Sequence, residues 1–346
     1  MVKSATISFI AAMVVCLMAC HSPKDKVSDT NWSALPGVVS IDSLKSTDFV
    51  TTLDHAIDPS RNTVYAVAMQ YAWDTLSRLL PGGLLESNRY SGDLNLIRQA
   101  ARFQSALTKE EYSIRTEIDG TAIIAEAFFN KTLPFPSKME KADIPLVFNG
   151  QKVKAFGMYN PDPAIREFCQ IGYYESDQAF LLKIFPKDDA HEIWLLLCRD
   201  SLPTLGAVVE KAKDWNIIGT EQAGRESLQW KYRFNTDDLI SIPETKFNIA
   251  AHYKGLEGQL LYLKDGQRTI VTAYQRTGFI LNETGAVAES HAVMAVDSAI
   301  APVRMEIPPP KKLIFNQPFY IILKRKEASH PYFVMRVANA ELLVKK

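Results

Sequence analysis

The sequence has no long run of like charge, few cysteines and no familiar catalytic motif, and each absence narrows the functions open to the chain. Its 346 residues balance 39 Lys and Arg against 39 Asp and Glu, so the formal net charge is zero. A protein that binds a polyphosphate usually presents a basic patch, and this balance predicts none. We therefore expect no nucleic-acid partner.

Glycine and proline are also sparse, at 16 and 18 residues, whereas 47% of the residues are hydrophobic. This composition excludes disorder along most of the length, and a chain of this size readily buries a hydrophobic core.

Motifs for common enzyme chemistry are missing. There is no Gly-x-Ser-x-Gly elbow, no glycine-rich phosphate loop, no His-Glu-x-x-His and no Cys-x-x-Cys. The six histidines are scattered, and none has the spacing of a zinc-binding pair. We expect no metal, no cofactor and no enzymatic activity. A Ser/His/Asp triad assembled only by the fold stays open, and with it a cell-surface hydrolase.

The N-terminus has the pattern of an export signal. Lys3 precedes an apolar stretch at 7–17, which is too short to span a bilayer as a helix. Residues 17–20 read Leu-Met-Ala-Cys and resemble the bacterial lipobox, so we expect removal of 1–19 and acylation of Cys20. The predicted location is the bacterial cell envelope, lipid-anchored at the outer membrane or cell surface. A plain signal peptide with a chance cysteine is the alternative.

Two further cysteines, Cys169 and Cys198, lie in the body of the chain. An exported protein tolerates a disulfide between them, but buried free thiols are equally consistent with their apolar surroundings. The sequence leaves both open.

The chain after the signal divides into a polar tether at 20–60 and one domain at 61–346. Apolar periodicity predicts helices at 64–80, 94–107 and 205–215. The pair Asn149-Gly150 predicts a hairpin turn. The expected strands are 121–129, 144–148, 153–156, 178–185, 192–198, 229–234, 239–243, 269–281, 315–324 and 332–338. This inventory predicts an α+β fold rich in strands.

Three segments near the C-terminus occur in an order typical of one family. The segment 278–285 ends in Asn-Glu-Thr-Gly, and 332–339 contains Met-Arg-Val. Between them stands a signature of four residues, Phe315, Asn316, Pro318 and Phe319. Together these segments resemble the serpins, a family of serine protease inhibitors, over about 143–343. The resemblance implies large mixed and antiparallel sheets, N-terminal helices and an exposed reactive-centre loop at about 285–312.

The chain also departs from the serpin pattern. Its N-terminal third is short, and no Ser-Pro-x-Ser shutter sequence is present. Met335 replaces a glycine of the family, and Gln275 stands where the shutter histidine is expected. These departures put the opening of the main sheet in question.

The resemblance implies a hinge at Glu283, Thr284 and Gly285, after which a cleaved loop would enter the main sheet as a strand. Side chains alternate between the two faces of a strand, and one alternate set here is entirely small. That set is Ala286, Ala288, Ser290 and Ala292, and the other is Val287, Glu289, His291 and Val293. We expect the small set to enter the core after cleavage, and Ala286 to be exposed before it.

Two bonds compete as the cleavage point. Counting from the hinge gives Ala299 and Ile300, which suit an elastase-like protease. Counting back from the prolines at 308–310 gives Arg304 and Met305, which suit a trypsin-like one.

The function that the resemblance implies is inhibition of serine or papain-like cysteine proteases by loop cleavage and insertion. We expect a monomer that uses no catalytic residue of its own. The alternative is a non-inhibitory serpin-like surface scaffold or binding module.

Overall fold

The computed structural model describes residues 35–80, 82–100, 107–109, 111–129, 131–159, 162–286 and 309–346. These residues form a seven-stranded, a six-stranded and a four-stranded sheet, two short strand pairs and a few helices. The fold class is therefore α+β with several mixed sheets, as the sequence predicts. No helix in the described ranges is both long and apolar enough to cross a membrane.

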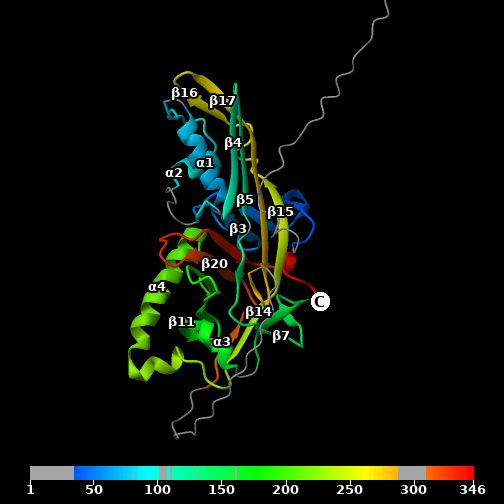
Figure 1. The fold of residues 1–346 in the computed structure, drawn as a ribbon, viewed down its shortest axis with the longest axis vertical. Helices are drawn as coiled ribbons and strands as arrows, with labels where there is room; N and C mark the ends of the chain where they lie inside the picture. The colour runs from blue at the N-terminus through cyan, green and yellow to red at the C-terminus, as the bar shows by residue number, and fades with distance from the viewer. Residues whose placement is uncertain are drawn as a thin grey trace, which may run out of the picture.

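The six-stranded sheet is the long central sheet of Figure 1. Its order is β1 (Val39–Ser40), β15 (Thr245–His252), β17 (Gly266–Leu281), β5 (Ala122–Phe129) and β4 (Tyr112–Asp119), and β16 (Leu260–Leu263) also pairs with β17. The two middle strands, β17 and β5, run parallel, whereas β15 and β4 are antiparallel to them. The expected strands at 121–129 and 269–281 are thus confirmed.

The seven-stranded sheet packs behind the central one. Its order is β11 (Cys169–Ser176), β12 (Ala179–Ile184), β13 (His191–Leu197), β20 (Phe319–Arg325), β21 (Phe333–Val337), β3 (Asn62–Ala66) and β2 (Thr47–Val50). All residues of β13 are buried, so the predicted hairpin of two apolar strands, β12 and β13, is confirmed.

The four-stranded sheet has the order β19 (Lys312–Ile314), β14 (Leu239–Pro243), β10 (Ala155–Met158) and β7 (Glu140–Lys141). The short pairs are β18 (Gly285–Ala286) with β6 (Leu133–Pro134), and β8 (Leu146–Phe148) with β9 (Gln151–Val153). Asn149 and Gly150 between β8 and β9 both have positive φ, at 45° and 82°, which is the backbone of the predicted hairpin turn.

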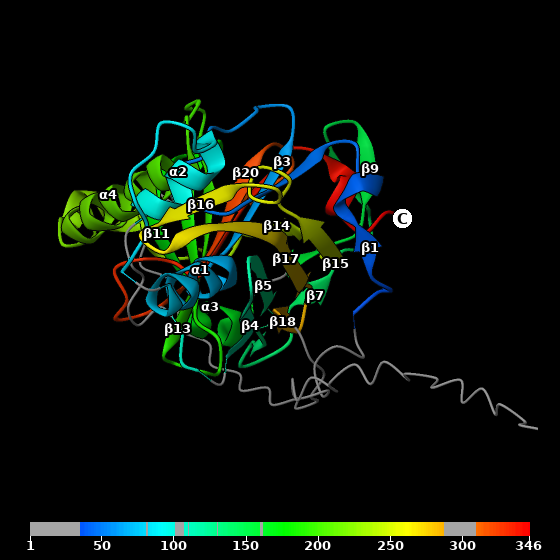
Figure 2. The same ribbon diagram turned by 90° about the horizontal axis from the view of Figure 1, so that it is seen from above.

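The α-helices are α1 (Ala68–Leu79), α2 (Gly92–Gln99), α3 (Pro163–Phe168) and α4 (Leu205–Ala223), and the 3₁₀ helices are η2 (Ile41–Ser43), η3 (Glu226–Lys231) and η4 (Ala340–Leu342). Helix α1 buries Met69, Ala72 and Leu76 against the central sheet. Figure 2 shows α1, α2 and α4 on one side of the molecule and β1 and β15 on the other. The Ser91 and Thr204 side chains cap α2 and α4.

Several expected segments differ from the structure. The helix expected at 64–80 is a strand, β3, followed by α1, because its first residues are buried on both faces of the seven-stranded sheet. The strand expected at 229–234 is wrong, since η3 occupies its first half and no strand follows there. The expected tether at 20–60 ends much earlier, because β1 and β2 join two of the sheets. Buried threonines at 47, 51 and 52 made this part look polar in sequence.

An aromatic cluster joins the two large sheets. The ring of Phe333 in β21 stacks on Phe129 in β5, with centroids 5.8 Å apart, and on Phe279 in β17, at 4.7 Å. Stacked aromatic pairs stabilise a fold beyond their buried area. Phe333 therefore holds both parallel strands of the central sheet against the sheet behind them.

Candidate functional site

The chain reverses direction directly after β17. Asn282 and Gly285 exchange two backbone hydrogen bonds of 3.1 Å, which close the turn. The Asn282 side chain accepts hydrogen bonds from the backbone N–H and the hydroxyl of Thr284, at 2.9 and 2.7 Å. Asn282 thus orients the segment that the sequence marked as a hinge.

The segment after this turn is docked on β6. Gly285 pairs with Pro134 and Ala286 with Leu133, in antiparallel register. Gly285 has a φ of +124°, and a Cβ there would lie 2.5 Å from the Leu133 carbonyl oxygen. Only glycine fits this backbone and this close approach.

Glu283 adds an ionic contact to the docked hinge. Its buried carboxylate lies 3.1 Å from the Lys141 ammonium and 3.5 Å from that of Lys138. The hydrogen bond with Glu283 raises the pKa of Lys141. Burial, together with the nearby charge of Glu283, raises the pKa of Glu244. The three expected pivot residues, Glu283, Thr284 and Gly285, therefore all make specific contacts.

The structure corrects our expectation for Ala286. We expected it at the exposed base of the loop, but its exposed fraction is 0%. The reason is that β6 continues beyond the end of β5 and offers a strand edge with which the hinge pairs. Other predicted residues lie outside the described ranges, namely Cys20, Ala288, Ser290, Ala292, Ala299, Ile300, Arg304 and Met305.

The far end of the predicted loop is anchored by a buried ion pair. The Lys311 ammonium lies 2.7 Å from the Asp238 carboxylate, and both side chains have an exposed fraction of 0%. The same ammonium donates to the carbonyl oxygens of Trp230 and Arg233, at 3.1 and 2.9 Å. Such a pair needs several partners to offset desolvation, and it has them. The chain is thus fixed at Ala286 on one side of 287–308 and at Lys311 on the other.

Gln275 stands at the position where the serpin resemblance predicts a shutter histidine, and its side chain makes two hydrogen bonds. Gln275 is fully buried in β17, and its side-chain oxygen accepts a 3.1 Å hydrogen bond from the Met69 N–H at the start of α1. Its amide nitrogen donates to the Thr277 hydroxyl at 2.9 Å. An amide side chain therefore links β17 to the helix beneath the central sheet.

The signature residues lie where the chain passes from the four-stranded to the seven-stranded sheet. Phe315 and Phe319 are buried, with ring centroids 5.0 Å apart, and the Asn316 carbonyl accepts from the Asn149 N–H. The expected strand at 315–324 begins only at Phe319, because Pro318 has no N–H to offer a sheet.

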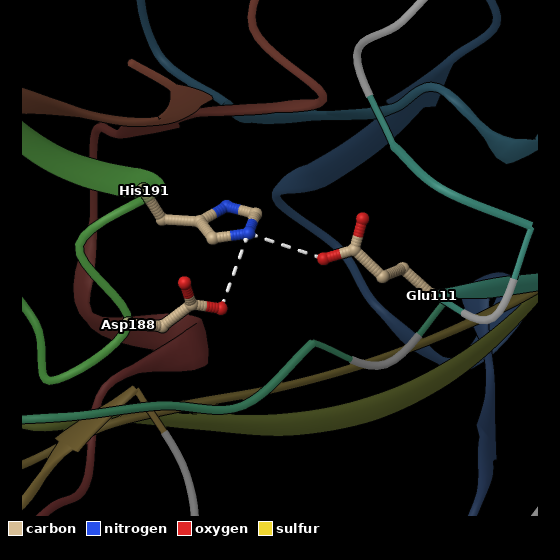
Figure 3. Close-up of side chains that lie close together, drawn as sticks. All are labelled: Glu111, Asp188 and His191. Atoms are coloured by element: carbon tan, nitrogen blue, oxygen red, sulfur yellow. Dashed lines mark ion pairs between the residues drawn. The ribbon is translucent and has the colours of Figure 1, made fainter.

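One group of three potential metal ligands occurs in the described part of the chain. Ligand atoms of Glu111, Asp188 and His191 lie within 4.8 Å of one another (Figure 3). His191 Nε2 is 3.1 Å from Glu111 and 3.4 Å from Asp188. No sequence motif marks these residues, since Glu111 lies far along the chain from Asp188 and His191, which are only three residues apart.

Protein cations already neutralise this group. The Lys131 ammonium donates to Glu111 and lies 3.5 Å from Asp188, and Arg325 contacts the other oxygen of Glu111 at 3.1 Å. Burial alone would raise the pKa of Glu111, but hydrogen bonds from His191 and Lys131 hold it well below its usual range. The arrangement fits an ion network that joins the β4–β5 side of the central sheet to β13 and β20 better than a metal site.

A second His-centred group resembles a hydrolytic triad only in composition. The Thr51 hydroxyl is 3.0 Å from His55 Nε2, and His55 Nδ1 is 3.9 Å from Asp93. Thr51 is only 2% exposed, so a substrate has no access to its hydroxyl. The contacts stabilise the turn after β2.

Cys169 and Cys198 are free thiols. Burial raises the pKa of both, to about 11 for Cys198, which leaves them largely protonated at neutral pH.

No family model and no curated protein matches this chain. Among solved structures it is similar to Serpin48 of the insect Tenebrio molitor (16% identity, TM-score 0.37, 63% of this chain and 56% of that one). It is also similar to Serpin-12 of Manduca sexta (13%, 0.38, 63% and 56%) and to a serpin of Schistosoma mansoni (13%, 0.36, 64% and 56%). The chain spans little more than half the length of these proteins.

The solved structures named here are all serpins. The details of the hinge and of its two anchors come from this chain alone.

The docked hinge yields a direct test of its glycine. We expect Gly285→Ala to lower the unfolding free energy of the uncut protein by about 1–3 kcal/mol, because the methyl group meets backbone atoms of β6. Urea unfolding measures the change. Gly37→Ala is the matched control, since nothing lies within 4 Å of its Cβ position. Equal stabilities of the two variants would contradict docking.

The ion network yields a pH-dependent test. We expect Glu111→Gln to destabilise the protein by roughly 2–4 kcal/mol at pH 7, because Lys131 and Arg325 lose their charged partner. The folded-state pKa of Glu111 is lowered, so its contribution is present above the unfolded pKa of about 4.5 and is lost as pH falls below it. The gap between wild type and variant should therefore narrow in acid.

Glu117→Gln is the control for this test, because the Glu117 side chain is half exposed and pairs with Arg115 at the surface. A Glu111→Gln effect no larger than that of Glu117→Gln, or one independent of pH between 7 and 3, would refute the assignment.

Proposed function

We propose that this chain inhibits serine proteases, and papain-like cysteine proteases as a second class, by the serpin mechanism. A protease cleaves the segment at 285–312, and the freed N-terminal part inserts into the central sheet as a new strand. The observation that supports this most strongly is the position of β18. This short strand pairs antiparallel with β6 on one side, and its first residue bridges to Asn282, just after β17, on the other. The chain is then a substrate for one turnover and not an enzyme.

The central sheet offers a physical reason for insertion. β17 and β5 are adjacent and parallel, and parallel pairing is slightly less stable per residue than antiparallel pairing. A strand that continues β18 between them would replace one parallel ladder with two antiparallel ladders. The backbone groups of the loop would also gain partners. Both changes favour the inserted state.

The registers of these strand pairs predict where each loop residue would go. Gly285 lies opposite Asn282 and opposite Pro134. Extending both ladders places Ser290 between Thr277 and Phe129, which are themselves register partners.

The same extension places Ala292 between Gln275 and Ala127, which are also register partners. All four neighbours, Thr277, Phe129, Gln275 and Ala127, have buried side chains. The two ladders are thus compatible, and they direct the small alternate set of the loop inward.

The outward set suits the opposite face. In the same register His291 falls beside Arg276 and Phe128, which are only partly buried. Burying a charged residue such as Glu289 without a partner would cost several kcal/mol, and this register avoids it.

Insertion would move the cut end a long way. A strand rises about 3.3 Å per residue, so insertion of 287–299 would carry an acylated protease roughly 40 Å along the sheet. Lys311 remains on the other side of either cleavage point, held by its ion pair with Asp238. Strand insertion would then supply the free energy that distorts the acyl-enzyme before deacylation.

A non-inhibitory serpin-like scaffold is the second candidate, and two contacts favour it. Phe333 stacks on both β5 and β17, and Gln275 is hydrogen-bonded to the start of α1. Both contacts oppose the separation of β17 from β5 that insertion requires.

Paired loop variants distinguish these functions. We expect wild type to form a denaturant-resistant adduct with an elastase-like or a trypsin-like protease. Ala292→Arg should be cleaved without trapping, because its guanidinium would have to enter the core. His291→Arg, one residue away, should trap as wild type does. Gel electrophoresis after incubation gives the readout. No adduct from wild type with active protease recovered, or equal effects of the two variants, would refute inhibition by insertion.

We also propose that the mature protein is held in the bacterial cell envelope through acylated Cys20, with 21–34 between the lipid and the described fold. Cys20→Ser should abolish acylation and release the protein from the membrane fraction, whereas Cys16→Ser should not, since Cys16 is removed with the signal. Mass spectrometry of the mature N-terminal peptide decides this. An unmodified Cys20 in wild type would disprove the anchor.

A further inference from the structure

A cavity of about 380 Å³ lies at one end of the seven-stranded sheet and shares no residue with the hinge. Its floor comes from three neighbouring strands. Tyr320 in β20 and Arg336 in β21 are register partners, and Leu196 in β13 lies opposite Tyr320. Cys198 is two residues beyond Leu196 and so projects to the same face.

Two segments that leave the sheet form the walls. One contains Ile57 and Pro59, and the other is the stretch 199–202 after β13. The Ile57 N–H donates to the Pro203 carbonyl at 2.9 Å, and Ala56 forms a bridge with Thr204. These backbone contacts fix the two walls to each other, so the shape of the cavity is defined by the fold.

Arg336 is the distinctive group of this cavity. It is only 7% exposed, and its guanidinium donates to the Arg61 carbonyl oxygen at 3.0 Å. It also hydrogen-bonds to the Tyr320 hydroxyl, and its charge acts on the exposed Asp58 carboxylate, which it helps to hold at a lowered pKa. Burial raises the pKa of Tyr320 although the hydrogen bond from Arg336 opposes this, so the tyrosine is neutral at pH 7. Both acceptors are thus uncharged.

The nearby carboxylates are engaged elsewhere. Asp200 lies on the cavity lining but is half exposed and pairs with Lys211 at 2.6 Å. Asp48 pairs with Arg61. No ion pair within 4.0 Å joins Arg336 to an acidic side chain anywhere in the described ranges. Asp58 is solvent-exposed, accepts hydrogen bonds from Ser60 and makes no ion pair with Arg336 within 4.0 Å. A buried guanidinium without a contacting counter-ion is costly, and an anion that enters the cavity would relieve that cost.

We propose that this cavity binds a small organic carboxylate, with its carboxylate on the Arg336 guanidinium and its apolar body against the wall. The planar fork of an arginine matches a carboxylate in bidentate geometry. The volume lies near the lower end of the range for small-molecule sites. The apolar part of the wall consists of Ile57, Pro59, Leu202 and Pro318. The Asp200 carboxylate on the lining disfavours a dianion such as phosphate.

Calorimetry on the full chain tests this proposal with hexanoate and phenylacetate, and with hexanamide and phenylacetamide as neutral counterparts. We expect both acids to bind and both amides to bind at least about tenfold more weakly, since only the acids pair with Arg336. Inorganic phosphate should bind more weakly than either acid. No binding of the acids up to about 10 mM, equal binding of acids and amides, or tighter binding of phosphate would overturn the proposal.

Variants locate the site. Arg336→Met should weaken hexanoate binding at least about tenfold, whereas Arg199→Met should change it less than about twofold, because Arg199 lines the same cavity but is exposed to solvent. Ser201→Trp places a bulky side chain on the cavity lining at an exposed position, leaves Arg336 intact and should also abolish binding. Equal losses in the two arginine variants, or full binding by Ser201→Trp, would refute the assignment.

Discussion

The parallel pairing of β17 with β5 at the centre of the six-stranded sheet determines where an additional strand could enter. These two adjacent parallel strands, each flanked by an antiparallel neighbour, could accept one antiparallel strand between them, and the hinge turn directs the chain toward that place. The contacts of Phe333 and Gln275 hold the two strands together in the uncut chain. In the proposed function, these contacts stabilise the uncut state, and extension of β18 between β17 and β5 stabilises the cleaved state.

The hinge and the Lys311 anchor give this competition a defined geometry. The first two residues of the inserting strand are already paired with β6. Insertion would therefore extend an existing strand ladder and would not have to form a new strand pair first. Lys311 is fixed by a fully buried ion pair, so the distal part of the cut loop would stay in place.

Local sequence patterns predicted the elements that depend on local chemistry. Asn149-Gly150 specified a hairpin, the apolar runs around β12 and β13 specified buried strands, and the sequence around Phe315 and Phe319 indicated the fold. Patterns failed where a distant partner decides the outcome. Ala286 is buried only because β6 lies beside it, Lys311 is buried only because Asp238 neutralises it, and η3 replaced a strand through tertiary packing. The cluster of Glu111, Asp188 and His191 follows no motif at all.

Insertion of the cut loop can be detected from the melting temperature of the chain before and after a single cut within 287–308. A chain of this size gains roughly 2–4 °C for each kcal/mol of added stability. If the cut loop extends β18 between β17 and β5, the cleaved protein should melt at least about 10 °C above the uncut one. An unchanged or lower melting temperature after cleavage would show that the loop stays outside the sheet, and it would contradict the account.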